Sequence, residues 1–126
     1  GKRPLSSMTP TIILEDGKLR FVLGSPGGGR IITTVGNIFL SAAEGGLNIQ
    51  EAVDAPRFHH QYQPDKLYLE PGFSAETIAG LRSMGYELVL STRHWSDGEC
   101  IAVDPKTGEL EGVQDHRGHM GKAAGY

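Results

Sequence analysis

The sequence predicts an α+β fold in which a mainly antiparallel sheet is flanked by helices. Apolar runs stand on either side of short turn motifs, as in β-hairpins, and other apolar residues recur at helical spacing. The 126 residues fit a single domain, residues 1–126, because domains usually contain about 100 to 200 residues.

The composition is that of a folded globular protein, with 38% apolar residues, 21% charged residues and a net charge of -3. Lys and Arg are scattered among a larger number of Asp and Glu, so no basic stripe indicates a nucleic-acid partner. No apolar run reaches the roughly 18 residues that a membrane span needs. Cys100 is the single cysteine, which excludes an internal disulfide and a cysteine-based zinc cluster.

The first predicted element is a hairpin, in which residues 11–14 and 19–23 flank the turn pair Asp16-Gly17. Alternation along the strands predicts two apolar faces. The first comprises Ile12, Leu14, Leu19, Phe21 and Leu23, and the second comprises Ile13 and Val22. Apolar residues on both faces favour a sheet that is covered on both sides.

A glycine-rich loop, residues 25–30, leads into a predicted helix that runs from Ile31 to a stop at Gly45-Gly46. Asn48, followed three residues later by Glu51, predicts the capped start of a second helix, which Pro56 ends.

The second half of the chain reads as a polar-aromatic connector over residues 58–62, a strand over 66–70 and a helix that begins at Ser74. That helix is expected to bury Ile78 and Leu81 and to end at Gly85. A strand over 86–90 follows, and a last hairpin has strands 99–103 and 109–114 around a turn at 104–108. The tail, residues 117–126, is too small and too polar for a core element.

Two segments could bind a negatively charged group. The glycines of the loop let the backbone approach a ligand, and N–H groups at the start of the following helix favour an anion or oxyanion. The loop has neither the Gly-Lys-Ser/Thr ending of a P-loop nor the spacing of a dinucleotide fingerprint, and a tight turn without ligand is the alternative. Ser6 and Ser7, in an irregular segment between two prolines, could bond a carboxylate, although surface serines are common in loops.

The histidines do not predict a metal site. His59 and His60 are adjacent and point in opposite directions in an extended segment, while glycines around His116 and His119 disfavour the helical turn that would join them. The sequence therefore indicates neither a metal nor another cofactor. No nucleophile elbow suggests a Ser-His-Asp triad, and the apolar surroundings of Cys100 favour a core position.

Four blocks of sequence together resemble the small subunit of a gamma-glutamyltransferase, in the order and spacing of that family. They are residues 3–12, 24–31, 55–61 and the closing Gly125-Tyr126. The resemblance implies part of an N-terminal-nucleophile hydrolase, an αββα sandwich, in which a precursor cuts itself and the newly exposed Thr attacks a gamma-glutamyl amide such as that of glutathione. It also implies that the backbone amides of Gly27 and Gly28 form the oxyanion hole, and that Ser6 and Ser7 bind the alpha-carboxylate.

Some family features differ here. The nucleophilic Thr, its supporting Thr and the acidic residues for the alpha-amino group precede the Ser6-Ser7 block in the family, where this chain has only Gly1 and Lys2. Since Gly1 has no side chain, we expect the chain alone, as the C-terminal part of a small subunit, to be inactive. Gly29 replaces a small side-chain residue, and Asp115-His116-Arg117 departs from the usual Asp-Pro-Arg, so no role is transferred to it.

The resemblance also implies partners: a large subunit, the start of the small subunit, and gamma-glutamyl compounds as substrates. Without these subunits, apolar faces would be uncovered and a homodimer is expected. Relatives work in the periplasm, outside the cell or at its surface, and nothing in these residues fixes the compartment. Two alternatives stay open: a related acylase for cephalosporins or poly-gamma-glutamate, or a non-catalytic binding module with the same fold.

Overall fold

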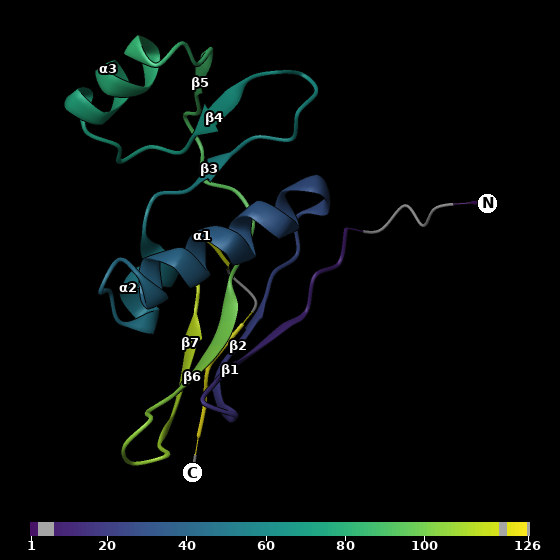
Figure 1. The fold of residues 1–126 in the computed structure, drawn as a ribbon, viewed down its shortest axis with the longest axis vertical. Helices are drawn as coiled ribbons and strands as arrows, with labels where there is room; N and C mark the ends of the chain where they lie inside the picture. Colours follow the sequence, from purple (N-terminus) through teal and green to yellow (C-terminus); the bar gives the residue numbers. More distant parts are fainter. Residues whose placement is uncertain (3–6, 119–120, 126) are drawn as a thin grey trace. The chain divides into compact units, whose positions relative to one another are not determined.

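The computed structural model describes residues 1–2, 7–118 and 121–125. The chain divides into two compact units. Unit 1 contains residues 1–55 and 96–126, and unit 2 contains residues 56–95. The chain is α+β, as predicted, while its grouping into one domain stays a prediction. Figure 1 shows the elements of both units.

Unit 1 is built on a four-stranded antiparallel sheet. Its strands, in spatial order, are β1 (Thr11–Glu15), β2 (Lys18–Gly24), β6 (Glu99–Val103) and β7 (Leu110–Gln114). Both predicted hairpins are confirmed. Asp16 and Gly17 have positive φ angles of 51° and 77°, which a two-residue hairpin turn requires. In the second turn, the N–H groups of Lys106 and Thr107 donate to the carboxylate of Asp104.

The predicted faces of the first hairpin are partly wrong. Leu14 pairs with Leu19 as expected, but Ile13 pairs with Phe21, and the register shifts between Ile13 and Leu14. One extra residue on the β2 side forms a bulge, and a slip of one residue exchanges the two faces of a strand. Ile13 therefore packs against the core, whereas Ile12 is 70% exposed.

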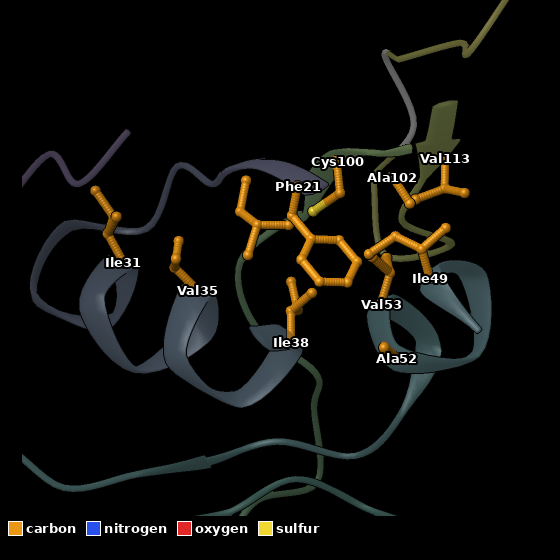
Figure 2. Close-up of a cluster of buried hydrophobic side chains, with 11 residues drawn as sticks. Phe21, Ile31, Val35, Ile38, Ile49, Ala52, Val53, Cys100, Ala102 and Val113 are labelled. Atoms are coloured by element: carbon orange, nitrogen blue, oxygen red, sulfur yellow. The ribbon is translucent and has the colours of Figure 1, made fainter. Parts of the chain in front are cut away.

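Two helices cover one face of this sheet. The short 3-10 helix η1 (Gly28–Arg30) leads directly into α1 (Ile31–Ala43), and α2 (Ile49–Asp54) follows with the predicted capping box of Asn48 and Glu51. Side chains of α1 and α2 converge on Phe21 and Cys100 of the sheet (Figure 2). The core position predicted for Cys100 is thus confirmed.

The other face of the sheet carries no helix among the residues that the structure describes. Ile12, Val22 and Ile101 lie in register across three strands on that face, and Ile101 is 39% exposed. The expectation of a sheet covered on both sides is therefore not met within unit 1. The described part of the tail approaches this face, where Ala123 lies beside Gly112 of β7.

Unit 2 contains a small mixed sheet and one helix. The strands are β3 (Phe58–His59), β4 (Leu67–Leu69) and β5 (Leu88–Leu90), and the helix is α3 (Ala75–Ser83), which begins after Ser74 as predicted. β4 pairs antiparallel with β3 and parallel with β5. The predicted connector over residues 58–62 thus begins as a strand, because two residues of it pair with β4. Ile78 and Leu81 are half-buried, and α3 buries no residue fully.

Within the described ranges, none of the helices has the length and apolar character needed to span a bilayer.

Candidate functional site

The glycine-rich loop forms a sharp turn between β2 and α1. Gly27 has φ 136° and Gly28 has φ 59°, backbone conformations that residues other than glycine rarely adopt. Gly28 opens η1, and the N–H of Arg30 donates to the carbonyl of Gly27 at 3.2 Å. Ser25 Oγ donates to the carbonyl of Pro26 at 2.6 Å, which tightens the start of the loop.

The N–H groups of Gly27 and Gly28 donate no hydrogen bond to any residue that the structure describes. This follows from their place in the chain, because the first N–H groups of a helical segment have no partner within it. The thirteen residues of α1 follow η1 directly, and the aligned peptide dipoles make this end favourable for negative charge. The turn therefore has the donors that a carbonyl oxygen or another oxyanion needs.

Of the two predicted serines, Ser6 lies outside the described residues. Ser7 is half-buried, and its main-chain carbonyl accepts a hydrogen bond from Thr9 Oγ1 at 2.7 Å. This hydrogen bond uses the backbone of Ser7 and does not involve the Ser7 hydroxyl.

Ser96 is a neighbour of the glycine turn that could not be expected from the sequence. A β-carbon added to Gly27 would lie 2.1 Å from Ser96 Oγ, so the two residues are in direct contact. Ser96 also has a positive φ of 58°. No local pattern predicts this contact, because it joins a turn before α1 to the segment that enters β6.

Asp115, a buried carboxylate that directly follows β7, binds the segment that leads from Ser96 into β6. Its Oδ2 accepts from the N–H of Gly98 at 2.7 Å, and its Oδ1 accepts from the N–H of Arg117 at 2.9 Å and from Arg117 Nη1 at 3.0 Å. The guanidinium also donates to the carbonyls of Val53 and Ala55 at the end of α2, both at 2.9 Å. The sequence alone assigns no role to Asp115 or Arg117, although their separation by a single residue is the feature that could have indicated the pair.

His116, between them, pairs with Asp54. His116 Nδ1 lies 2.8 Å from Asp54 Oδ1. Partial burial of Asp54 acts to raise the pKa of its carboxyl, but hydrogen bonds with His116 and Gln50 outweigh that and hold the pKa below its usual value.

Asp54, Asp115 and His116 also place one ligand atom each within 4.8 Å of one another. A cation between them would have to share Asp115 Oδ1 with the guanidinium of Arg117, which already neutralises that carboxylate. The arrangement is therefore better described as an ion-pair network than as a metal site. His119, which the sequence did not predict to join His116, lies outside the described residues.

The other two histidines discussed above belong to unit 2 and have different partners. His59 Nε2 lies 3.1 Å from Gln61 Oε1, and His60 Nε2 lies 2.8 Å from Asp65 Oδ1. The pair of His60 and Asp65 borders a mainly apolar cavity of about 630 Å³ between α3 and β4. None of the described residues predicted for the site lines this cavity.

Comparison with known proteins gives a consistent result over the whole chain. A family model described as gamma-glutamyltranspeptidase matches residues 1–126. The glutathione hydrolase proenzyme of Escherichia coli (strain K12) is 49% identical over 125 residues, which cover 99% of this chain and 21% of that protein. The chain thus spans about a fifth of the length of the curated relatives that it matches.

Solved structures agree with the sequence matches. A mutant gamma-glutamyltranspeptidase of Helicobacter pylori superposes with a TM-score of 0.85 at 46% identity, covering 93% of this chain and 64% of that chain. The gamma-glutamyltranspeptidase of Pseudomonas nitroreducens, solved in complex with L-DON, gives a TM-score of 0.83 at 34% identity and covers 100% of this chain and 66% of that chain.

Proposed function

The chain belongs to the gamma-glutamyltranspeptidase family, and from this premise we propose that residues 1–126 supply part of a site for gamma-glutamyl transfer or hydrolysis. The substrates would be gamma-glutamyl compounds such as glutathione. In this proposal Gly27 and Gly28 provide the oxyanion hole, and Ser6 and Ser7 hold the alpha-carboxylate of the glutamyl group.

The observation that carries the proposal is the pair of N–H groups in the glycine turn. Attack on an amide carbonyl places negative charge on its oxygen, and N–H donors already in position stabilise that charge more than they stabilise the substrate. Each such donor is commonly worth roughly 3 kcal/mol to an acyl transfer. Gly27 and Gly28 have N–H groups without another acceptor among the described residues, at the positive end of a helical segment.

Ser6 and Ser7 supply a complementary part of the proposed site. Hydroxyl groups donate hydrogen bonds to a carboxylate without adding positive charge, so they can select a substrate with a free alpha-carboxylate. Ser7 is half-buried, which suits a residue that contacts a small bound group.

The nucleophile of the proposed reaction is a Thr that these 126 residues do not supply. An N-terminal nucleophile needs a hydroxyl or thiol next to its own free amine, and the first residue here is Gly1. A polypeptide of these residues alone is therefore expected to leave gamma-glutamyl compounds unchanged.

The open face of the sheet in unit 1 supports a further part of the proposal. Ile12 and Ile101 expose apolar surface there. In a complete αββα sandwich this face would pack against a second sheet, contributed by the large subunit and the start of the small subunit. By itself, the chain would cover the face in a homodimer.

The test uses a carrier enzyme: the full-length Escherichia coli relative with the segment that this chain matches replaced by residues 1–126. Hydrolysis of gamma-glutamyl-p-nitroanilide is measured for the carrier enzyme and for the 126-residue chain. The carrier enzyme should be active and the chain alone inactive. Turnover by the chain alone would contradict the missing-nucleophile part of the proposal.

The oxyanion hole is tested with two matched alanine variants of the carrier enzyme. Gly28 and Gly17 both have positive φ and open space where a β-carbon would stand, so both substitutions strain the backbone in the same way. Gly28→Ala moves an N–H of the proposed hole and should lower kcat by about 100-fold. Gly17→Ala, in an exposed hairpin turn, should leave kcat unchanged. Equal kcat for both variants would exclude Gly28 as an oxyanion donor.

A further inference from the structure

Ser96 has a backbone conformation that serine seldom adopts. Its φ of 58° lies in the left-handed region, where the β-carbon of an L-residue comes close to the backbone. Glycine would satisfy this conformation without strain. The chain nevertheless has a side chain here, and its Oγ is buried.

That side chain occupies the space beside Gly27. A β-carbon built on Gly27 would lie 2.1 Å from Ser96 Oγ and 3.1 Å from Ser96 Cβ. Both distances are shorter than a normal van der Waals contact. A β-carbon built on Gly28 would meet no atom within 4 Å. The glycine turn is thus packed against Ser96 at its first residue and open at its second.

The segment that carries Ser96 is itself fixed. Two residues further on, the N–H of Gly98 donates to the buried carboxylate of Asp115 at 2.7 Å. Gly98 leads into β6, which pairs with β2, the strand before the glycine turn. Ser96 therefore approaches Gly27 from a segment held by a carboxylate and by the sheet.

We propose that Ser96 is a positioning residue for the oxyanion hole: its side chain packs against Gly27 and keeps the N–H groups of the Gly27-Gly28 turn in one orientation. This inference rests on the proposed function. Ser96 acts through Gly27 and touches no substrate atom. Its effect belongs to the transition state, because the oxyanion forms only there, so it changes kcat more than KM.

The unusual backbone gives this role a distinctive signature. Replacing Ser96 by glycine relieves an unfavourable φ, so a residue of purely structural importance would be neutral or stabilising when changed in this way. A positioning residue loses catalytic rate upon the same change, because the turn gains freedom. The catalytic rate is therefore expected to fall while stability stays the same or rises.

The experiment uses the carrier enzyme defined above, with kcat, KM and thermal midpoint measured for each variant. Ser96→Gly should lower kcat by about 10-fold, with KM changed by less than about twofold and the thermal midpoint equal or higher. Ser96→Ala keeps the β-carbon and removes only Oγ, so its kcat should lie between those of Ser96→Gly and the parent. Asp16→Gly is the matched control: Asp16 has φ 51° in an exposed turn, and its change should leave kcat unaltered.

A double variant tests the contact directly. Gly27→Ala should lower kcat by about 100-fold, because the new β-carbon meets Ser96 Oγ. In the Ser96→Gly variant that space is open. The fold decrease in kcat of the double variant should therefore be smaller than the product of the two single decreases, a coupling that independent sites do not show.

The outcomes separate the two proposals. If Gly27→Ala and Gly28→Ala impair kcat while Ser96→Gly and Ser96→Ala leave it unchanged, the role of Ser96 is wrong and the oxyanion hole stands. If all four variants keep the parental kcat, the proposed function of the turn is wrong as well. Strict additivity of Gly27→Ala and Ser96→Gly would also overturn the positioning role.

Discussion

Each unit contains a buried carboxylate that binds main-chain N–H groups close to where the chain passes from one unit to the other. In unit 2, Glu70 accepts from the N–H of Arg57 at 3.0 Å and from the N–H of Trp95 at 2.7 Å. In unit 1, Asp115 accepts from the N–H groups of Gly98 and Arg117. Glu70 is 3% exposed and Asp115 is 0% exposed, so both would be costly to bury without these donors.

The two carboxylates differ in the cation beside them. Asp115 has the permanently charged guanidinium of Arg117 at 3.0 Å, two residues away in sequence. Glu70 has His94 Nδ1 at 3.3 Å, a group that is charged only when protonated. Glu70 also joins segments that are far apart in the chain. Unit 2 therefore depends on Glu70 for main-chain contacts at both of its ends, and Arg57 Nη1 adds a 3.3 Å hydrogen bond to the carbonyl of Trp95. Unit 1 shares the same task between Asp115 and Arg117.

The largest expected effect tests that dependence. Glu70→Ala removes the acceptor of two buried N–H groups and should destabilise unit 2 by about 3 to 5 kcal/mol. The measurement is urea unfolding followed by the fluorescence of Trp95, the single tryptophan, which is buried in unit 2.

Glu87→Ala is the control for that variant, since its ion pair with Lys66 is at the surface and should change the midpoint little. Equal midpoints for the two variants would show that Glu70 does not hold the ends of unit 2.

A smaller effect is expected for Asp115→Asn. The amide keeps one oxygen for a main-chain donor but turns an NH₂ group toward another donor, so unit 1 should lose about 2 kcal/mol. Hydrogen–deuterium exchange of a peptide containing Gly98 measures the effect locally, and a peptide from α3 in unit 2 is the reference. Unchanged protection at Gly98 would contradict the anchoring role of Asp115.

The helix caps allow a comparison in which the two units should behave alike. Asn48 caps α2 in unit 1 and Ser74 caps α3 in unit 2, each through a side-chain oxygen that accepts a main-chain N–H. Asn48→Ala and Ser74→Ala should each cost about 1 kcal/mol. Exchange of amides in the first turn of each helix measures this. Protection that falls in only one helix would show that the other is held by packing alone.

The smallest expected effect is on the pH dependence of stability in acid. The folded state holds the pKa of Asp54 below its usual value, so the unfolded chain binds more protons and stability falls as the pH drops below about 4. The stabilisation is present above that range. Asp54→Asn should make the acid-induced loss shallower, measured as the urea midpoint of unit 1 between pH 5 and pH 3. A steeper loss in the variant would contradict the sign.

Local elements could be predicted from the sequence because their signals are local. Asp16-Gly17 specifies a tight hairpin, and Asn48 with Glu51 specifies a capped helix start. The bulge that moves Ile13 to the core face could not be predicted, because it depends on how the whole β1–β2 pair fits under α1. The parallel pairing of β4 with β5 likewise joins segments separated by a helix.

The candidate site likewise has one part that could be predicted from local sequence and one part that could not. The glycine turn was recognisable, since consecutive glycines before a helix indicate positive φ angles and open N–H groups. The contact of Gly27 with Ser96 was not, because nothing near residue 96 marks it as a neighbour of residue 27. The network of Asp115 and Arg117 also depends on carbonyls at the end of α2, which only the folded chain brings within reach.

The exposed isoleucines of β1 and β6 have a practical consequence for handling the chain. A sheet with one helix-covered face and one apolar face is amphipathic, so wherever no second copy covers Ile12 and Ile101 the chain should adsorb to surfaces and bind the dye ANS. Ile12→Thr and Ile101→Thr, which keep β-branched strand formers, should improve recovery without touching the interior. Such surface-engineered chains are the natural starting material for solution work on this polypeptide.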